Sequence, residues 1–211
     1  MQVQAVNDAG NLLFFVCFLT TVILAAILIY RKLRGRPVRR LVIAIATCFS
    51  VYAVILIGVS LTSKTRDLAL GTKKCFDDWC ATVAGSRPLP LPNAAETKLL
   101  AVTLTVSNRA RQAAFRPSQP RVTLVLPSGS EVSPSSLGQR EFEKTAGPQE
   151  DLARRLVAGD SFQTTVVFEV PAATRDASVV LLEGPAFITR FLVGDENSFL
   201  HRKMVYPITV R

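Results

Sequence analysis

Two cysteines are the first residues in the chain whose spacing could do chemistry. Cys75 and Cys80 enclose the sequence Phe-Asp-Asp-Trp. In one straight strand, residues five apart would lie about 17 Å apart, whereas a disulfide joins Cα atoms roughly 4.4–6.8 Å apart. If residues 76–79 form a turn, the cysteines face each other across a hairpin, and an oxidising compartment then favours a disulfide. Free thiols are the alternative, and a zinc site would need further Cys or His ligands nearby.

The only histidine lies close in sequence to a serine and an aspartate. His201, Ser198 and Asp195 invite comparison with a Ser-His-Asp hydrolase. Such a triad is recognised by its geometry in the folded chain, and the sequence contains no G-x-S-x-G nucleophile elbow. We therefore expect His201 to be a surface residue at a turn, and we assign no catalytic residue. An extracytoplasmic hydrolase is kept as an alternative function.

Two acidic clusters could offer oxygen ligands to a cation. They are Asp77-Asp78 and Asp195-Glu196 with its neighbour Asn197. The calcium-loop spacing D-x-[DN]-x-[DN]-G is absent, and Asp and Asn at β-turns need no ion. We expect no metal. We also expect no cofactor, because the sequence has no Gly-rich phosphate loop, no dinucleotide fingerprint and no H-E-x-x-H helix.

Trp79 is the only tryptophan, and two interpretations of it stay open. It is either a core residue or an exposed aromatic that recognises a partner. The candidate interaction or turn residues are therefore Asp77, Asp78, Trp79, Asp195, Glu196, Asn197 and His201.

Two apolar runs near the N-terminus indicate that the chain is anchored in a membrane. Residues 12–30 are 19 residues without a charge, and residues 41–61 are 21. At a rise of about 1.5 Å per residue, a helix of this length can cross a hydrocarbon core about 30 Å thick. Both runs should be helical, because backbone N–H and C=O groups in lipid must form hydrogen bonds within the segment. Transporters and pumps usually carry ionisable groups inside the membrane, and these runs carry none, so we interpret them as an anchor. Cys17 and Cys48, inside the runs, are expected to be packing residues.

The net charge of +9 is concentrated between the two runs. Residues 31–40 hold six of the 25 Lys and Arg and no acid, whereas residues 63–211 hold 19 basic and 15 acidic residues. We exclude nucleic acid as a partner, because we find neither a basic stripe nor aromatic residues interleaved with Lys and Arg. The positive-inside rule keeps residues 31–40 cytoplasmic and places residues after 62 outside. A cleaved signal peptide is disfavoured, because residues 1–11 contain no Lys or Arg.

The C-terminal part of the chain alternates with a period of two, which is typical of half-buried antiparallel strands. The alternating runs are residues 99–106, 122–126, 161–170, 187–193 and 204–210. Residues 179–182 are apolar on both faces, as in a central strand. About seven or eight short strands in roughly 140 residues predict an all-β, immunoglobulin-like antiparallel sandwich.

Three local features refine this picture. Pro207 favours an edge strand or a bulge for the last run. Residues 134–157 lack a strand pattern, and we expect them to form a variable contact surface. Within them, residues 149–157 follow Pro148 with acids early and arginines late, which predicts one or two turns of helix.

Several short motifs resemble a bacterial protein family. The sequences LVAGDSF and VFEVP within residues 156–171, followed by LLEG at 181–184, are similar to membrane-tethered, extracytoplasmic Ig-like domains of unknown function. Some members carry a label taken from a telomere-repeat-binding factor. CFDDWC at 75–80, SGSEVSP at 128–134 and GDENSFLH at 194–201 fit the same family. The resemblance covers about residues 73–210 and implies an Ig-like sandwich outside the cytoplasm, with no known activity.

The predicted architecture is a two-helix transmembrane hairpin followed by the sandwich. Its parts are an extracytoplasmic arm (1–11), a transmembrane helix (12–30), a cytoplasmic loop (31–40), a second transmembrane helix (41–62), a linker (63–72) and the extracytoplasmic sandwich (73–211). We expect a non-catalytic binding module at the cell membrane that contacts the lipid bilayer and another protein of the membrane or cell envelope. Contact would use loops at one end of the sandwich or an open edge strand.

An accessory or structural subunit of a membrane complex is the first alternative. Small residues in the spans would let them pack closely against another membrane protein. These residues are Ala25, Ala26, Ala44, Ala46 and Gly58.

Overall fold

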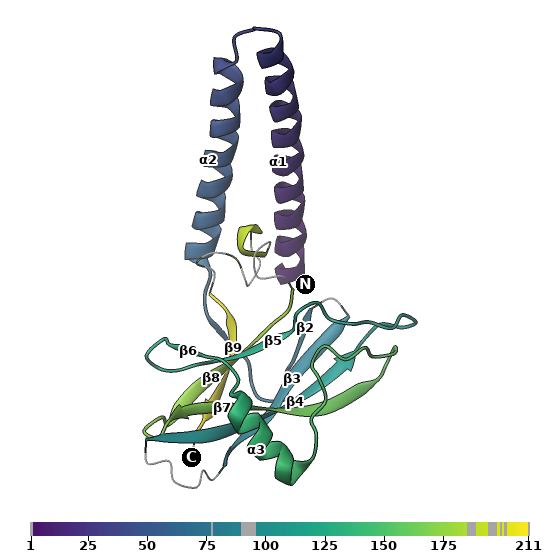
Figure 1. Cartoon of the computed structure of the whole chain (residues 1–211), viewed down its shortest axis with the longest axis vertical. Coiled ribbons are helices and arrows are strands. Elements are labelled where there is room, and N and C mark those ends of the chain that lie inside the picture. Colours follow the sequence, from purple (N-terminus) through teal and green to yellow (C-terminus); the bar gives the residue numbers. More distant parts are fainter. Residues whose placement is uncertain are drawn as a thin grey trace. The chain divides into compact units, whose positions relative to one another are not determined.

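The computed structural model divides the chain into two compact units (Figure 1). The first contains Met1–Lys64 and Ala186–Lys203, and the second contains Thr65–Pro185 and Met204–Arg211. The structure describes residues 2–76, 78–89, 96–184, 189–193, 198, 200 and 202–210. We expected residues 73–211 to form one uninterrupted sandwich. Ala186–Lys203 instead group with the helices in the first unit.

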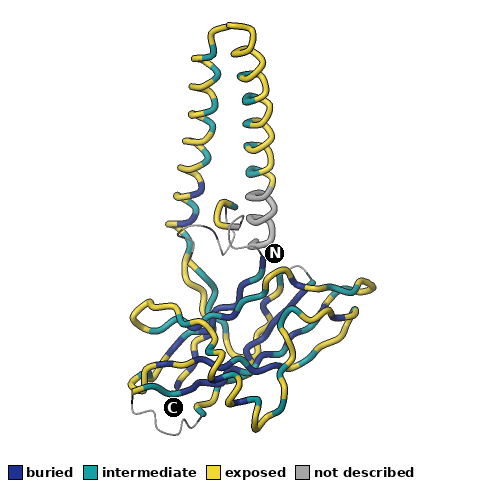
Figure 2. The backbone as a smooth tube through the Cα atoms, viewed as in Figure 1, coloured by how far each residue is buried: buried dark blue, intermediate teal, exposed yellow. Residues whose placement is uncertain are grey.

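The first unit is built on two helices, α1 (Gln2–Leu33) and α2 (Arg39–Thr62). Their segments Leu12–Leu33 and Arg39–Thr62 are long and apolar enough to span a membrane. Most side chains on the helices are exposed, as Figure 2 shows, and many of them are large and apolar. An apolar surface of this extent is typical of contact with lipid or with another protein.

The two helices pack along a half-buried seam. Cys17 on α1 and Cys48 on α2 lie on it as free thiols, with their sulfur atoms 3.2 Å apart. The ring of Phe14 packs against Tyr52, with centroids 6.1 Å apart. The two cysteines therefore take part in helix packing, as expected from the sequence.

The second unit is a β-sandwich of two sheets. One sheet has the strand order β2-β3-β4-β7, and all of its neighbouring strands are antiparallel. Its strands are β2 (Lys73–Phe76), β3 (Trp79–Leu89), β4 (Thr97–Asn108) and β7 (Ser161–Pro171). The other has the order β1-β9-β8-β5-β6; its strands are β1 (Arg66–Asp67), β9 (Met204–Thr209), β8 (Asp176–Leu182), β5 (Arg121–Val125) and β6 (Glu131–Val132). Only the β1–β9 pair is parallel among these.

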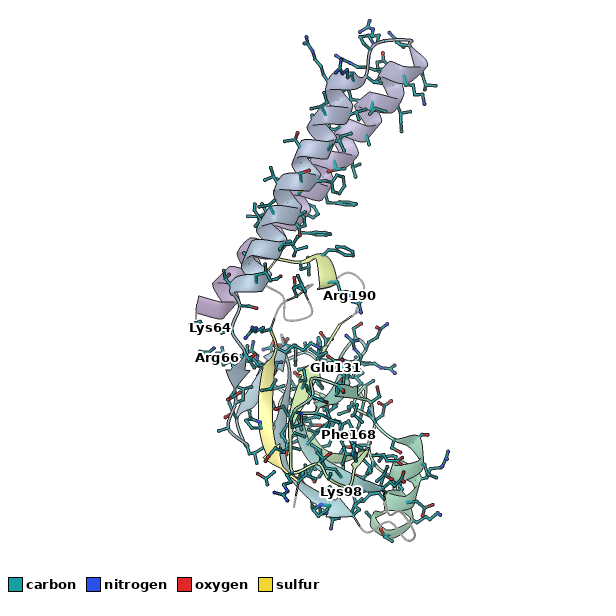
Figure 3. The ribbon with its side chains drawn as sticks, turned by 90° about the vertical axis from the view of Figure 1, so that its left-hand side faces the viewer. Lys64, Arg66, Lys98, Glu131, Phe168 and Arg190 are labelled. Atoms are coloured by element: carbon teal, nitrogen blue, oxygen red, sulfur yellow. A yellow bond between two sulfur atoms is a disulfide. The ribbon has the colours of Figure 1, made fainter. Side chains whose placement is uncertain are left out.

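The core lies between the sheets and is filled by alternate residues of both. Leu100 and Leu104 of β4, Phe168 of β7 and Tyr206 of β9 are fully buried there. Phe168 is labelled in Figure 3. This alternation is the period of two seen in the sequence, because successive strand side chains point to opposite faces. The predicted all-β sandwich is confirmed at this level.

The last two strands explain two sequence features. β8 lies between β5 and β9, so it is the central strand that its apolar faces predict. β9 pairs with β8 through residues 206–209 but with β1 only at Met204 and Val205. Among the described strands, none pairs with the other side of β9 at Pro207, and a residue without an N–H is tolerated there.

The strand predicted at residues 187–193 is wrong over residues 189–193; residues 187 and 188 lie outside the described residues. Thr189–Phe191 form a single turn of 3-10 helix, η1, which belongs to the first unit. The carbonyl of Phe191 accepts a hydrogen bond from the hydroxyl of Tyr52 on α2. The backbone here thus bonds to a helix side chain and not to a neighbouring strand, although the apolar alternation is the same.

The helix predicted at residues 149–157 is also wrong, because the helix lies earlier, as α3 (Ser136–Ala146). Ser135 caps its start, with its Oγ accepting the N–H of Gly138 at 3.1 Å. Gly147 ends it with a φ of 82°, a left-handed conformation suited to glycine. Pro148 therefore follows a helix end, and the acids and arginines after it lie in a loop.

α3 covers part of the outer face of the β3-β4-β7 sheet (Figure 1). Phe142 packs there with Leu99, Ala101 and Val167 in a second, smaller apolar cluster. Gly138 permits the close approach, since a Cβ at this position would lie 2.8 Å from Leu99 Cδ2. The first part of the expected contact surface, residues 134–157, is thus used to cover the sheet.

Candidate functional site

A disulfide joins Cys75 and Cys80 and closes the β2–β3 hairpin. The two residues are cross-strand partners with Cα atoms 4.0 Å apart, and the next pair toward the tip is Phe76 with Trp79. The cysteines can therefore bond because they face each other across the hairpin, as the sequence spacing required. The bond fixes the strands directly below the hairpin tip.

Removing this disulfide is expected to destabilise the sandwich moderately. Changing Cys75→Ser and Cys80→Ser together should lower the free energy of unfolding by about 2 kcal/mol, because a short closed loop restricts the unfolded chain only modestly. Pulse proteolysis of the full chain in detergent, at increasing urea, measures the shift. The double variant Cys17→Ser/Cys48→Ser is the control, since both thiols are free. An unchanged urea midpoint for the first variant would contradict the expectation.

The hairpin tip connects to the loop that follows β4. The carbonyl of Asp78 accepts the backbone N–H of Arg109 at 2.8 Å. Trp79 is 1% exposed and packs against Phe76, with ring centroids 5.6 Å apart. Of the two interpretations of Trp79, the structure therefore selects the core residue, and the ring is not available as an exposed recognition aromatic.

Asn108, the last residue of β4, organises two loops at this end of the sandwich. Its side chain is buried, and its Nδ2 donates to the carbonyls of Ala113 at 2.9 Å and Leu156 at 3.1 Å. Its Oδ1 accepts the N–H of Ala110 at 2.9 Å. One amide thus fixes both loops. Asn108 is not among the residues predicted from sequence, because an Asn at the end of a strand is equally typical of an ordinary turn.

The two loops, residues 109–116 and 150–157, are also joined directly; we call them the arginine loops. Phe115 and Leu156 exchange two backbone hydrogen bonds of 2.9 Å, and Arg116 Nε donates to the carbonyl of Ala153 at 3.0 Å. Arg154 also pairs with Glu150 at 2.7 Å. The loops contain five exposed arginines and no lysine, namely Arg109, Arg111, Arg116, Arg154 and Arg155.

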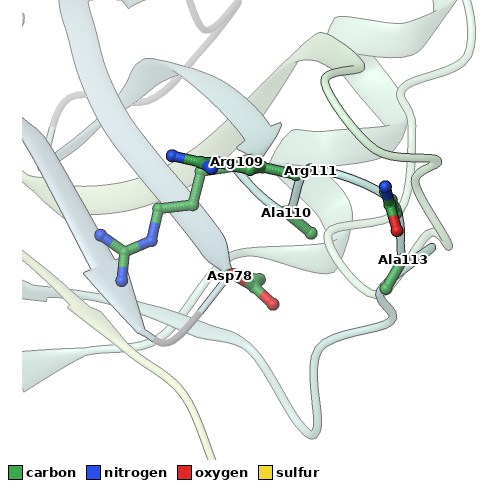
Figure 4. A pocket seen from close by; sticks show the side chains of 6 residues that line it. Asp78, Arg109, Ala110, Arg111 and Ala113 are labelled. Carbon is green, nitrogen blue, oxygen red and sulfur yellow. The ribbon is translucent and has the colours of Figure 1, made fainter.

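An open hollow of about 690 Å³ lies between the hairpin tip and the first arginine loop (Figure 4). Its lining residues are Asp78, Arg109, Ala110, Arg111, Gln112 and Ala113. The lining therefore combines a carboxylate, two arginines and an amide with two small alanines. Such a mixture suits a polar side chain of a partner protein.

The free edge of β7 is occupied by two glutamine side chains. Gln139 of α3 donates from Nε2 to the carbonyl of Thr165 at 3.0 Å, and its Oε1 accepts the N–H of Val167 at 3.1 Å. Gln149 Oε1 accepts the N–H of Thr165 at 2.9 Å. These amides take the place of a neighbouring strand, so β7 does not offer the unpaired edge that strand addition needs.

The remaining sequence candidates fall outside this site. Asp77, Asp195, Glu196, Asn197 and His201 lie outside the described residues, so their predicted roles stay predictions. Ser198 is buried in the first unit, with its Oγ 3.3 Å from Ser60 Oγ. Within the described part of the chain, no three His, Cys, Asp or Glu side chains lie close enough to hold a metal ion.

Comparisons with known proteins find only distant structural similarity. No family model matches it, and neither does any curated protein. A conserved hypothetical protein of Bacillus anthracis has a TM-score of 0.44 at 13% identity, over 57% of this chain and 97% of that one. An uncharacterized β-sandwich protein of Clostridium difficile has a TM-score of 0.41 at 11% identity, over 69% and 95%. A secreted protein of Mycobacterium tuberculosis has a TM-score of 0.38 at 13% identity, over 57% and 100%.

These structural neighbours are bacterial proteins, and the Bacillus anthracis and Clostridium difficile ones have no described activity. At such low similarity they carry no information on what this chain binds. The resemblance to the membrane-tethered family therefore stays a prediction.

Proposed function

We propose that the chain is a non-catalytic, membrane-anchored binding module. Its two helices hold it in the cell membrane, and its sandwich contacts an acidic partner protein of the membrane or cell envelope. The observation that carries the proposal is the pair of arginine loops, which one buried amide, Asn108, and the Phe115–Leu156 bonds hold together. A surface held this firmly loses little entropy when a partner binds.

The use of arginine supports a protein partner. Arginine is enriched at protein interfaces, where its planar guanidinium bonds carboxylates in pairs, whereas lysine is depleted. Five arginines and no lysine on two adjoining loops match that preference. Loops are favoured over strand addition at β7, because Gln139 and Gln149 occupy that edge.

Two observations support an extracytoplasmic sandwich. The connection between the helices, residues 31–40, carries six basic residues and no acid, which the positive-inside rule keeps in the cytoplasm. The Cys75–Cys80 disulfide is typical of an oxidising compartment outside the cytoplasm. The residue after α2 would then begin the extracytoplasmic part.

The strand pairing supports an immunoglobulin-type sandwich. β3, β4 and β7 pair in the order of Ig strands A, B and E, and β9, β8 and β5 pair in the order of strands G, F and C. In the sequence, α3 lies directly before β7, where strand D would be expected before strand E. The second arginine loop then follows α3 and leads into strand E, and the first lies between strands B and C, at an end of the sandwich that many Ig domains use for recognition.

Site-specific photo-crosslinking in native membranes tests the proposed contact. A benzophenone amino acid replacing exposed Gln112, in the hollow, is expected to give a discrete crosslinked product. The double variant Arg109→Ala/Arg111→Ala in the same background should reduce that product by about tenfold or more, since interface arginines commonly contribute about 1–2 kcal/mol or more each.

The matched control places the same crosslinker at exposed Glu141 on α3, where no product is expected. A product from Glu141 but none from Gln112 would contradict the proposed surface. A product from Gln112 that the arginine substitutions do not reduce would contradict the role of the arginines. Crosslinking only from the outer faces of the helices would instead favour the accessory-subunit alternative.

A further inference from the structure

Three described residues between β8 and β9, namely Phe191, Ser198 and Arg202, form hydrogen bonds with α2 or with Ser63 directly after it. Tyr52 Oη donates a hydrogen bond to the carbonyl of Phe191, Ser60 Oγ lies 3.3 Å from Ser198 Oγ, and Ser63 Oγ accepts the N–H of Arg202 at 2.8 Å. Positions 52 and 60 share one side of a helix with 3.6 residues per turn, and Ser63 is the first residue after α2. The later residues of the connection thus bond progressively closer to the C-terminal end of α2.

Burial agrees with these hydrogen bonds. Leu56 and Ser60 are the buried residues of α2, and both lie on the face that carries Tyr52. From the connection, Val193 and Ser198 are buried. η1 lies beside the helices in both views (Figures 1 and 3). The described residues of this connection therefore contact α2 within the first unit.

The depth of this contact follows from the length of α2. Tyr52 precedes the end of α2 at Thr62 by ten residues, which is about 15 Å along the helix axis. It follows Leu41, the first residue of the uncharged run, by eleven residues, or about 17 Å. Because a hydrocarbon core is about 30 Å thick, both measures along α2 place Tyr52 within it. Phe14 of α1 packs against Tyr52 and is the third residue of the uncharged run 12–30, so Tyr52 lies in the leaflet at the C-terminal end of α2. The backbone of Phe191 bonds to Tyr52 and must lie at a similar depth.

We propose that η1 and the adjoining Leu192 and Val193 form a re-entrant element, which dips into the hydrocarbon layer beside α2. Its partner is the acyl chains of the leaflet at the C-terminal end of α2, which contact the exposed ring of Phe191. The inference rests on the membrane anchoring of the proposed function. It adds a third membrane contact between β8 and β9.

The polar groups of the segment fit this setting. Irregular backbone at membrane depth needs internal hydrogen-bond partners, and Tyr52 supplies one to the carbonyl of Phe191. Arg190, labelled in Figure 3, has a long side chain whose methylenes can lie in the apolar layer while its guanidinium extends toward the headgroups. The hydroxyls of Ser60 and Ser198 share one hydrogen bond of 3.3 Å.

Depth-dependent tryptophan fluorescence tests the proposal on the full chain in liposomes. In Phe191→Trp, phosphatidylcholine with brominated acyl chains should quench most of the added emission, and aqueous iodide should quench little. The parent chain is a built-in control, because its only tryptophan, Trp79, is buried in the sandwich core. Val157→Trp, at an exposed apolar position of the second unit, should show the reverse pattern, with iodide quenching and no bromolipid quenching.

A second variant tests the hydrogen bond that holds the element at depth. Adding Tyr52→Phe to Phe191→Trp removes the donor to the carbonyl of residue 191, so bromolipid quenching should fall and iodide quenching should rise. Unchanged quenching would contradict the role given to Tyr52. Iodide quenching of the introduced tryptophan, in a chain that stays in the membrane during alkaline extraction, would overturn the re-entrant element alone. Release of the chain by that extraction would overturn the anchoring itself.

Discussion

Replacing Trp79 with alanine is expected to lower the free energy of unfolding of the sandwich by about 3–5 kcal/mol. The indole is 1% exposed and lies between the sheets at the disulfide hairpin, against Phe76. Its removal leaves a cavity as well as losing the transfer free energy of a large ring. Urea-dependent pulse proteolysis of the full chain in detergent measures the loss, because the variant has no tryptophan fluorescence to follow.

Trp79→Phe is the matched control and should cost clearly less. Phenylalanine keeps an aromatic ring in the site, and Trp79 Nε1 has no hydrogen-bond partner in the described part of the chain, so no such bond is lost. A stability change within about 0.5 kcal/mol for Trp79→Ala would be typical of a surface position. Such a small change would contradict the placement of Trp79 in the core and would favour the alternative that Trp79 is an exposed aromatic for recognition.

The strands that could be predicted from sequence are those whose alternation is unbroken. β4 and β7 alternate apolar and polar residues along most of their length, because one face of each packs in the core. β3 is absent from the predicted runs, although it is as long as β7. Its pairing with β4 shifts register between Val83 and Gly85, and Pro88 follows. The bulge and the proline interrupt the alternation of apolar and polar residues, so β3 has no regular period of two.

The η1 segment shows that alternation of apolar residues does not predict the element against which a segment packs. Alternating apolar residues indicate that one side of a segment is buried, but they do not identify what buries it. The carbonyl of Phe191 bonds to Tyr52, a residue 139 positions earlier in the chain. No local pattern distinguishes that helix face from the face of a sheet, so periodicity alone assigns the segment to the sandwich.

The disulfide could be predicted because its geometry is local, whereas the arginine loops could not. The spacing of Cys75 and Cys80 allows a bond only across a turn. The arginine loops lie far apart in sequence and become one surface only through Asn108 and the pairing of Phe115 with Leu156. The distribution of charge along the sequence identifies the basic run at residues 31–40. It does not predict that the two arginine loops lie next to each other in the folded chain.

Replacing Gln139 with leucine is expected to lower the free energy of unfolding by about 2–4 kcal/mol. The change leaves the N–H of Val167 and the carbonyl of Thr165 without this partner, and each buried, unsatisfied group costs about 1–3 kcal/mol. It also frees part of the β7 edge, so the variant should self-associate through added strands. Urea-dependent proteolysis measures the first effect, and size-exclusion chromatography of the full chain in detergent measures the second.

Gln112→Leu is the control, because it makes the same substitution at an exposed loop position and should change neither property. The result bears on how the module binds. If Gln139→Leu is destabilised and associates, the native chain protects β7 against strand addition, and recognition must use other surfaces such as the arginine loops. If it stays as stable and as monodisperse as the parent, the glutamine is not needed to cover the edge. Strand addition at β7 would then return as a mode of contact, and the argument for the loops would have to rest on the arginines alone.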